Sequence, residues 1–251
     1  MIHGRDVAAI LLGAGVGKRM QSDLAKVLHP VLGRPLLDHV IDAVRAAGVD
    51  RIVVVVGHQA ERVRAAMAGR GVEFVLQAPQ LGTGHAVQQA EPLLAGHGGD
   101  LLVVCGDTPA LRPATLEELY ETHLGTGASA TVLTAELDDP TGYGRVLRAP
   151  DDRVLRIVEH KDATPAERRV REINSGMFAF HARDLFEALG EVRPDNAQAE
   201  YYLTDTLQIL RSKGRRISAH RCRDPREVLG VNTPEQLEEV ERFMAEKVRN
   251  A

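Results

Sequence analysis

Residues 7–20 read Val7-Ala8-Ala9-Ile10-Leu11-Leu12-Gly13-Ala14-Gly15-Val16-Gly17-Lys18-Arg19-Met20. The first six form an apolar run without alternation, which is typical of a strand buried on both faces of a parallel sheet. The glycines after it let backbone N–H groups approach a phosphate chain closely, and Lys18 and Arg19 add positive charge. We therefore predict a buried strand that ends in a phosphate-binding glycine loop, residues 13–17.

The glycine loop fits neither of two common nucleotide-binding patterns. A Walker A loop needs G-x-x-x-x-G-K-[ST], but Arg19 follows Gly17-Lys18 and Leu12 stands at the first glycine place. A dinucleotide fingerprint needs G-x-G-x-x-G, and its last place falls on Lys18 or Met20. A nicotinamide-dependent oxidoreductase is therefore disfavoured. Taken alone, the loop leaves a purely structural tight turn as an open alternative.

Downstream of this loop, apolar runs alternate with amphipathic stretches. We expect strands at 7–12, 51–56, 72–76 and 101–105, and helices at 35–47, 60–67, 83–94 and 113–123. This order indicates an α/β fold: a Rossmann-like, mostly parallel sheet with helices on both faces. Ligands of such sheets bind beyond the carboxyl ends of the strands. The places to search are thus the residues after Leu12, Leu76 and Cys105.

The second half of the chain has a different pattern. We expect strands at 128–136, 144–147, 154–159 and 173–180, and helices at 201–213 and 234–248. These strands predict a smaller mixed β extension that forms the other wall of a cleft. We expect a single domain over 1–251, with a nucleotide-binding part (1–125), a sugar-binding part (126–231) and a C-terminal helix (232–251).

Composition narrows the class of protein. The 251 residues are 44% hydrophobic with a net charge of -4, so there is no overall attraction to nucleic acid or to an anionic membrane. Cys105 and Cys222 fit no zinc or redox spacing, which favours a reducing, cytoplasmic setting. We find neither a signal peptide nor an apolar run long enough to span a membrane.

Several motifs, taken in order, resemble those of the sugar-phosphate nucleotidyltransferases. The resemblance is strongest to the uridyltransferase domains that act on N-acetylglucosamine 1-phosphate. It rests on the glycine loop together with Ser22-Asp23-Leu24-Ala25-Lys26-Val27-Leu28-His29-Pro30, Gly33-Arg34-Pro35-Leu36, Leu76-Gln77-Ala78-Pro79-Gln80-Leu81-Gly82-Thr83-Gly84-His85-Ala86, Gly106-Asp107-Thr108-Pro109, Gly142-Tyr143-Gly144-Arg145, Ile157-Val158-Glu159-His160-Lys161, Glu172-Ile173-Asn174-Ser175-Gly176, Glu200-Tyr201-Tyr202-Leu203-Thr204-Asp205 and Gly230-Val231-Asn232.

The resemblance implies a Mg²⁺-dependent transfer of UMP from UTP to a sugar 1-phosphate, with release of pyrophosphate. A sugar phosphate is largely a dianion near pH 7, so it needs charge neutralisation and positioning rather than a general base. By resemblance, Arg19 and Lys26 bind the phosphates, and Asp107 and Asn232 hold the metal. The remaining implied contacts are Leu12, Gly13, Ala14, Gly15, Gln77, Gly82 and Thr83 for the nucleotide, and Gly144, Glu159 and Asn174 for the sugar.

Simpler interpretations of some site residues stay open at this point. Asp107 is also a plausible turn residue, and Asn232 a helix cap before Pro234. Glu159 could pair with Lys161 at a strand end. The chain also departs from the family pattern at Gly13, Lys18, Ala25 and Cys105, where alanine, threonine, proline and, in one branch, tyrosine are usual.

Two other functions also stay open. A related nucleotidyltransferase could use glucose 1-phosphate or dTTP instead. The region of Glu159 and Asn174 is the part of the sequence that would distinguish such an enzyme from one that uses N-acetylglucosamine 1-phosphate. A non-catalytic sensor of nucleotide sugars is the alternative from another class, although Arg19, Lys26, Asp107 and Asn232 argue for catalysis. The sequence contains no hexapeptide repeats, so we do not expect these residues to form an acetyltransferase domain. The oligomeric state is left open.

Overall fold

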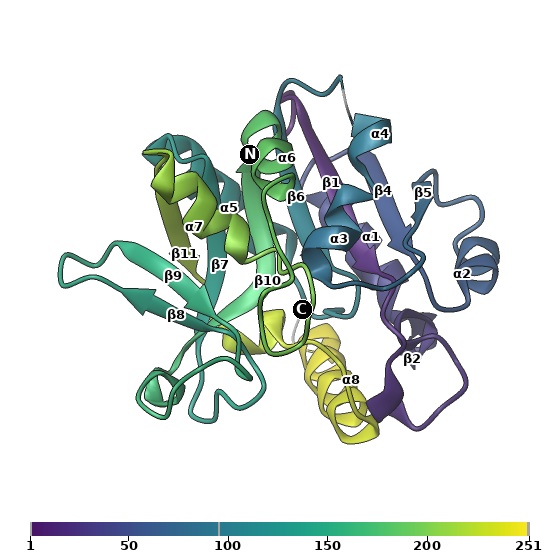
Figure 1. Ribbon diagram of the computed structural model, residues 1–251. Coiled ribbons are helices and arrows are strands. Elements are labelled where there is room, and N and C mark those ends of the chain that lie inside the picture. The colour runs from purple at the N-terminus through teal and green to yellow at the C-terminus, as the bar shows by residue number, and fades with distance from the viewer. Residues whose placement is uncertain (1, 95, 250–251) are drawn as a thin grey trace.

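The main sheet of the protein carries helices on both faces (Figure 1). The computed structural model describes residues 2–94 and 96–249. The sheet has nine strands in the order β11-β7-β10-β6-β1-β4-β5, with β8 and β9 attached beside β10. The expected α/β, Rossmann-like fold is therefore confirmed. The strands of this sheet are β1 (Val7–Gly13), β4 (Arg51–Val56), β5 (Glu73–Leu76), β6 (Asp100–Cys105), β7 (Ala130–Glu136), β8 (Arg145–Arg148), β9 (Val154–Val158), β10 (Glu172–His181) and β11 (Ile217–Arg221).

Eight α-helices and four short 3-10 helices connect these strands in the described part of the chain. A small hairpin, β2 (Pro30–Val31) and β3 (Arg34–Pro35), stands apart from the main sheet. The helices are α1 (Leu36–Ala46), α2 (Ala60–Ala66), α3 (Thr83–Gln88), α4 (Glu91–Leu94), α5 (Pro113–Thr126), α6 (Ala182–Leu189), α7 (Asp205–Ser212), α8 (Pro234–Arg249), η1 (Lys18–Met20), η2 (Lys26–Leu28), η3 (Glu167–Arg169) and η4 (Pro225–Val228).

The first half of the chain builds the parallel part of the sheet. Strand β1 lies between β4 and β6 and runs parallel to both. Leu12 pairs with Val55 on one side and with Cys105 on the other. Because the strands end in register, the glycine loop lies next to Gly106-Asp107. The edge that the sequence singled out as a ligand site is thus formed by neighbouring strands.

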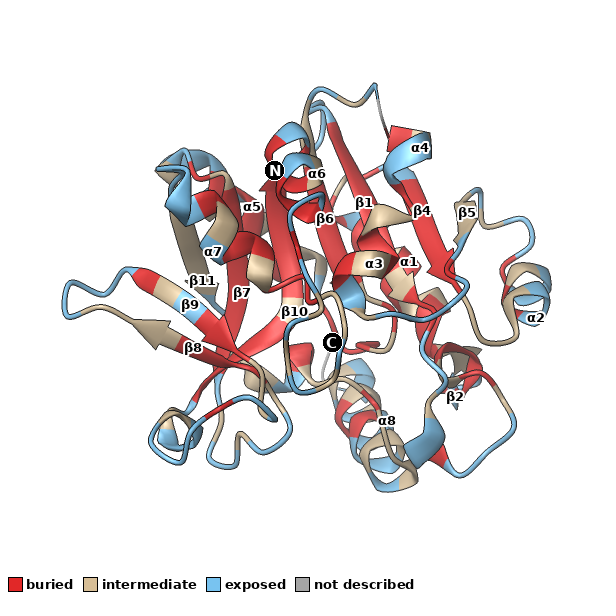
Figure 2. Cartoon of the chain, in the orientation of Figure 1, coloured by how far each residue is buried: buried red, intermediate tan, exposed pale blue. Residues whose placement is uncertain are grey.

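Burial on both faces explains why these strands read as continuous apolar runs. Ala9 and Leu11 of β1 pack in one core with α1 and α5. Ala8 and Ile10 point the other way, into a second core with α3, α6 and α7. Figure 2 shows the central strands as buried along most of their length. Neither face of the strand is left for polar residues, so in/out alternation is absent.

The second half of the chain extends the same sheet with mixed strand directions. Strand β10 is antiparallel to both β6 and β7, and β11 is parallel to β7. The β8–β9 hairpin joins through Ile173 of β10 and Arg145 of β8. The expected mixed extension is therefore present. We did not predict β11 or α6; the sequence of β11, Ile217-Ser218-Ala219-His220-Arg221, has no apolar run because it is an edge strand.

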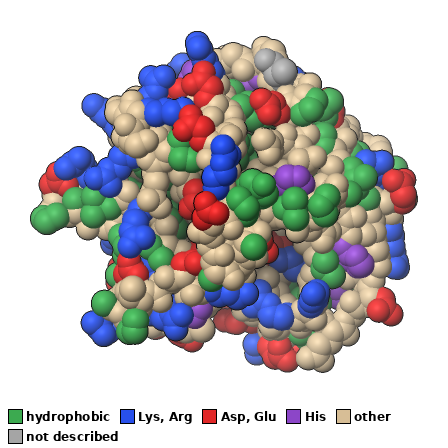
Figure 3. Space-filling model, in the orientation of Figure 1, with side chains coloured by type: hydrophobic (Ala, Val, Ile, Leu, Met, Phe, Trp, Pro, Cys, Tyr) green, Lys and Arg blue, Asp and Glu red, His purple; other side chains and the backbone are tan. Residues whose placement is uncertain are grey.

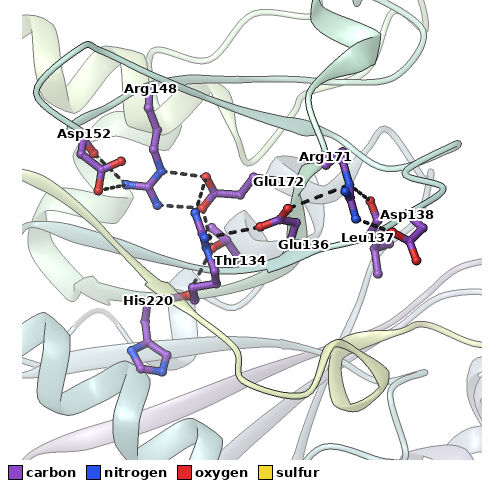
Figure 4. Close-up of polar contacts among 10 residues, drawn as sticks. Thr134, Glu136, Leu137, Asp138, Arg148, Asp152, Arg171, Glu172 and His220 are labelled. Atoms are coloured by element: carbon purple, nitrogen blue, oxygen red, sulfur yellow. Dashed lines mark hydrogen bonds and ion pairs between the residues drawn. The ribbon is translucent and has the colours of Figure 1, made fainter.

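A group of charged side chains ties the extension together (Figure 4). Arg148 of β8 donates from Nε and Nη2 to the two carboxylate oxygens of Glu172 in β10, each at 2.7 Å. Thr134 of β7 donates to the same carboxylate at 2.8 Å. Paired, charge-assisted bonds of this kind are strong and directional. They hold three strands together at a point where the register between β10 and β7 shifts, after Asn174.

A third, smaller apolar cluster seats α8. Val240 and Phe243 pack against Met20, Val31 and Leu36. Phe243 is 8% exposed in this cluster, whereas Val248 near the end of the helix is 71% exposed. Residues 250–251 of the expected C-terminal helix lie outside the described residues. This packing fixes where the loop before α8, which carries Asn232, meets the sheet.

Two expected helices differ from the observed ones. The helix expected at 83–94 is two helices, because Pro92 has no N–H to continue the hydrogen-bond ladder. The helix expected at 201–213 begins only at Asp205. Tyr201 and its neighbours instead run beside the 81–84 segment: the Tyr201 N–H donates to the Leu81 carbonyl, and the Gly84 N–H donates to the Tyr201 carbonyl, both at 2.8 Å.

None of the helices in residues 2–94 and 96–249 combines the length and the apolar character needed to cross a membrane.

Candidate functional site

The predicted site residues gather at the carboxyl edge of the sheet, above α8 in Figure 1. Gly13 ends β1, Gln77 follows β5, and Asp107 follows β6. The space-filling view shows a hollow in this face, with Lys and Arg side chains along its lower edge (Figure 3). Such an edge collects polar groups from several strands, which is why ligands of open α/β sheets bind there.

Gly17 fixes the position of Lys26. Its φ is +69°, in the left-handed region, and a Cβ at this position would lie 2.8 Å from the Lys26 Cβ. Glycine is therefore required for two reasons, backbone conformation and close packing. Gly15 is different, because a Cβ there would meet nothing within 4 Å. Gly15 leaves its backbone open to a ligand, whereas Gly17 supports the lysine.

Lys26, Asp107 and Asn232 meet at one point. The Lys26 ammonium forms an ion pair with Asp107 Oδ2 and donates to Asn232 Oδ1 at 3.1 Å. The side chains of Lys26 and Asp107 are only 17% and 13% exposed. One carboxylate oxygen and one amide oxygen thus converge on a single cation. Oxygen ligands of this kind are those that Mg²⁺ prefers, so the same pair could hold a metal ion.

Asn232 is not the cap of α8. Its side-chain nitrogen donates to the Gly230 carbonyl at 3.0 Å, which turns Oδ1 toward Lys26. Thr233 takes the capping role instead, because its hydroxyl accepts from the Gln236 N–H at 3.3 Å. The Gln236 side chain in turn accepts from the Asn232 N–H at 2.8 Å. The capping interpretation of Asn232 is therefore wrong, and its carboxamide oxygen is available to a cation.

The loop of Asn232 is also held directly against Asp107. The Val231 N–H donates to the Asp107 carbonyl at 2.9 Å. A Cβ at Gly230 would lie 3.1 Å from Asp107 Oδ2, so a larger residue would press on the carboxylate. In residues 2–94 and 96–249, no group of three or more His, Cys, Asp or Glu side chains could hold a metal on its own. Any metal at Asp107 and Asn232 must therefore take further ligands from substrate or water.

Other predicted phosphate ligands lie on the glycine loop and just after it. Arg19 is exposed on η1 and makes no ion pair within the described residues, so its guanidinium is free to bind an anion. The Ala14 carbonyl is turned away from such a ligand, because it accepts from the His58 N–H at 3.2 Å and from Gln80 Nε2 at 2.7 Å. Leu12 and Gly13 lie in β1 itself.

On the β5 side, Gln77 is 4% exposed and its backbone N–H donates to the Val56 carbonyl at 2.7 Å. Its side chain donates to the Gly82 carbonyl at 2.9 Å. Thr83 begins α3, and its hydroxyl accepts from the Leu203 N–H at 3.1 Å. The structure thus brings together three of the residues that the resemblance assigns to the nucleotide, Gln77, Gly82 and Thr83.

Gly144, Glu159 and Asn174 meet on the side of the extension. The Asn174 N–H donates to the Gly144 carbonyl at 2.9 Å. A Cβ at Gly144 would lie 3.2 Å from a Glu159 oxygen, so the carboxylate lies directly over this glycine. Asn174 Oδ1 accepts from the Gly176 N–H at 2.9 Å, which leaves the side-chain nitrogen as a donor. A carboxylate and an amide N–H suit the hydroxyl and carbonyl groups of a sugar.

Glu159 is bound by Thr204, not by Lys161. The Thr204 hydroxyl donates to Glu159 Oε1 at 3.1 Å. Burial raises the pKa of Glu159, and the nearby carboxylates of Asp162 and Asp205 raise it further. Glu159 also lines a cavity of about 200 Å³ together with Thr204 and Tyr202. The alternative interpretation, a strand-end pair with Lys161, is therefore wrong.

Sequence reasoning missed the supporting role of Arg145. Arg145 is fully buried and donates to the Tyr143 carbonyl, and it lies 3.4 Å from the Arg168 carbonyl. It thereby connects two loops next to Gly144. A buried arginine within a strand gives no local signal of this role, because its partners come from distant segments. Cys105, one of the departures from the family, packs its sulfur against the Ser175 and Gly176 carbonyls at 3.7 and 3.5 Å.

A family model described as the MobA-like NTP transferase domain matches residues 9–203. The match includes the glycine loop, Lys26, Asp107 and the sugar-side residues. The chain belongs to the MobA-like NTP transferase family. It is thus a nucleotidyltransferase, as the motifs led us to expect. Asn232 lies beyond the residues matched by this family model.

Curated relatives of this NTP transferase are named bifunctional protein GlmU. The chain is 51% identical over 243 residues to that of Pelotomaculum thermopropionicum, covering 97% of this chain and 53% of the relative. It is 50% identical over 244 residues to that of Geobacter metallireducens, covering 97% of this chain and 51% of the relative. The chain therefore spans about half the length of these relatives.

The fold of this NTP transferase is similar to that of a solved structure, described as the crystal structure of UDP-glucose pyrophosphorylase complexed with UDP-glucose. The TM-score is 0.78, and the superposition covers 96% of this chain and 98% of the other. The two sequences are 18% identical, so the likeness concerns the fold alone.

Proposed function

We propose that the chain transfers UMP from UTP to N-acetylglucosamine 1-phosphate, giving UDP-N-acetylglucosamine and pyrophosphate, with Mg²⁺ as the cofactor. The observation that carries the proposal is the convergence of Lys26, Asp107 and Asn232 beside the glycine loop. The resemblance of the motifs to uridyltransferase domains and the GlmU relatives, about 50% identical, support it.

The reaction joins two anions, and the proposed roles follow from that problem. A phosphate oxygen of the sugar phosphate attacks the α-phosphorus of UTP, and pyrophosphate leaves. Arg19 and Lys26 would neutralise the phosphates, Arg19 through its forked donors and Lys26 as a compact charge. The backbone of residues 12–15 would approach the triphosphate. No residue needs to remove a proton, because the attacking oxygen is already ionised.

Asp107 and Asn232 would hold Mg²⁺. Their two oxygens already converge on one cation, the Lys26 ammonium, which supports the fit of a metal ion at this place. A bound Mg²⁺ would neutralise phosphate charge as it develops in the transition state. Two protein ligands leave most of its shell open, so we expect the metal to bind together with the nucleotide.

The remaining residues would select the substrates. Gln77, Gly82 and Thr83 would bind the base, and Gly144, Glu159 and Asn174 the sugar and its N-acetyl group. Under this proposal residues 1–125 bind the nucleotide and 126–231 the sugar, with 232–251 as a supporting helix. An unpaired carboxylate or amide at the sugar side would penalise a sugar with the wrong pattern of polar groups.

The test is pyrophosphate release from UTP and N-acetylglucosamine 1-phosphate, with and without Mg²⁺. We expect release that requires both substrates and the metal, and faster release than with glucose 1-phosphate or dTTP. Equal rates with glucose 1-phosphate would contradict the assigned sugar, and equal rates with dTTP the assigned nucleotide. No release with any pair, from folded protein, would contradict the reaction itself.

A further inference from the structure

The side-chain nitrogen of Gln77 has two partners. It donates to the Gly82 carbonyl at 2.9 Å and lies 3.1 Å from His85 Nδ1. A carboxamide nitrogen carries two hydrogens, so both donors are in use. The facing Gly82 carbonyl also fixes which end of the amide is the nitrogen, because an amide oxygen there would meet another acceptor. His85 therefore completes the orientation of Gln77.

His85 must accept through Nδ1 to do this. Burial lowers the pKa of His85, so the ring is neutral near pH 7 and carries a single N–H. Its Nε2 lies 3.2 Å from the side chain of Gln89. Only one ring nitrogen can accept. Both side-chain nitrogens also donate to a carbonyl, Gln77 to Gly82 at 2.9 Å and Gln89 to His85 at 3.1 Å. Gln77 is 4% exposed and would lose its bond without replacement, whereas Gln89 is half-buried and can turn toward water. The proton therefore belongs on Nε2, and Nδ1 receives the Gln77 N–H.

Because both side-chain N–H groups of Gln77 are in use, only its side-chain oxygen can form a hydrogen bond with a ligand. Oε1 accepts no hydrogen bond in the described part of the chain, and it is not among the buried atoms that lack a partner, so solvent reaches it. The wall of the site thus presents a hydrogen-bond acceptor at this point.

This acceptor distinguishes two bases that occupy the same position. Uracil carries an N–H at N3, which can donate to the Gln77 oxygen. Cytosine, placed in the same position by its ribose and phosphates, has a lone pair at N3, which would face the Gln77 oxygen. A site that leaves polar groups mispaired in this way discriminates strongly between two ligands of the same size.

We propose that His85 is a positioning residue that holds the Gln77 carboxamide with its oxygen toward the base and thereby makes the site select uridine over cytidine nucleotides. This inference rests on the proposed function, and it adds to that function the residue that sets base selectivity. His85 has no contact with the substrate in this scheme and acts only through Gln77.

The test compares His85→Phe with Gln89→Leu, a matched control that removes the contact to the other ring nitrogen. Calorimetry of UDP and CDP binding gives the ratio of the two dissociation constants. We expect the preference for UDP to fall on the order of tenfold in His85→Phe, equivalent to about 1.4 kcal/mol, and to persist in Gln89→Leu. His85→Asn should recover much of it, because its amide oxygen can take the place of Nδ1.

Four results would overturn or redirect this inference. An unchanged UDP preference in His85→Phe, or an equal loss of affinity for UDP and CDP, would overturn it, since a merely structural role predicts either. If His85→Phe does not fold, ¹⁵N NMR of the wild-type histidines decides instead, and a proton on Nδ1 of His85 would refute the scheme. A wild-type protein that binds UDP and CDP equally would instead contradict the proposed base.

Discussion

Lys26 and Asp107 form an ion pair whose two side chains are largely buried, and Asn232 accepts a second hydrogen bond from the same ammonium at 3.1 Å. The ammonium therefore lies between the two oxygens that we propose as metal ligands. The lysine balances the charge of this carboxylate in the free protein. It also links the proposed phosphate-binding residues to the proposed metal ligands, because Lys26 contacts both Asp107 and Asn232.

Removing this ammonium should expose the metal ligands. We expect Lys26→Met to bind Mn²⁺ roughly tenfold more tightly than the wild type in the absence of nucleotide, because a nearby positive charge costs about 1–4 kcal/mol. Turnover should nevertheless fall by about 100-fold or more, since the phosphates lose a cation. Electron paramagnetic resonance of free Mn²⁺ measures the affinity. Lys18→Met, on the exposed loop, is the control, and equal Mn²⁺ affinity in all three proteins would contradict the prediction.

Loss of the carboxylate should abolish metal-dependent catalysis without unfolding the protein. In Asp107→Asn the shape is kept and the charge is lost, so we expect turnover at saturating Mg²⁺ to drop by about 100-fold or more. Asn232→Asp keeps an oxygen ligand and should retain a larger share of the activity. Pyrophosphate release measured over a range of Mg²⁺ concentrations, with circular dichroism as the folding control, checks both. Wild-type turnover in Asp107→Asn would remove this residue from the metal site.

Glu159→Gln should weaken binding of the sugar phosphate and raise the thermal stability of the protein at neutral pH. Because burial raises the pKa of Glu159, the folded protein holds this proton more tightly than the unfolded chain. The resulting stabilisation is complete below about pH 4, near the ordinary pKa of glutamate, and is lost as the pH rises through the raised pKa. The Tm of Glu159→Gln should therefore match the wild type in acid and exceed it at neutral pH.

Calorimetric scans from acid to neutral pH test this, with the exposed Glu238→Gln as the control. In kinetics, Glu159→Gln should raise the KM for the sugar phosphate about tenfold or more, because hydrogen bonds to a charged group are stronger than neutral ones. A Tm difference that does not vary with pH would show that Glu159 is not destabilised by its charge.

Two glycines of the same loop should respond differently to alanine. Gly17→Ala places a Cβ 2.8 Å from the Lys26 Cβ in a backbone with φ of +69°, so we expect a loss of about 1–2 kcal/mol in the free energy of unfolding, together with reduced turnover. Gly15→Ala meets no neighbour within 4 Å, so stability should be nearly unchanged. Urea unfolding of both variants measures this. Equal destabilisation would mean that the loop, not the contact with Lys26, requires glycine.

Much of the fold and of the candidate site was predictable from local pattern. The unbroken apolar runs predict strands buried on both faces, and the parallel order places Gly13 and Asp107 at the same edge. The motifs also predict that Lys26, Asp107 and Asn232 act together. Two helix predictions were wrong for separate reasons. Pro92 interrupts the helix expected at 83–94, and the hydrogen bonds of Tyr201 with Leu81 and Gly84 place the start of α7 at Asp205.

The sequence by itself determined the buried central strands, most of the helices and which residues carry charge at the strand ends, because burial and periodicity are properties of neighbouring residues. Only the tertiary structure decided which side chains meet. Asn232 reaches Lys26 across 206 positions because α8 packs on its own apolar cluster and Thr233 takes over the cap. The partner of Glu159, Thr204, likewise comes from a segment 45 positions away, since a hydrogen bond depends on where two segments of the chain come together in space.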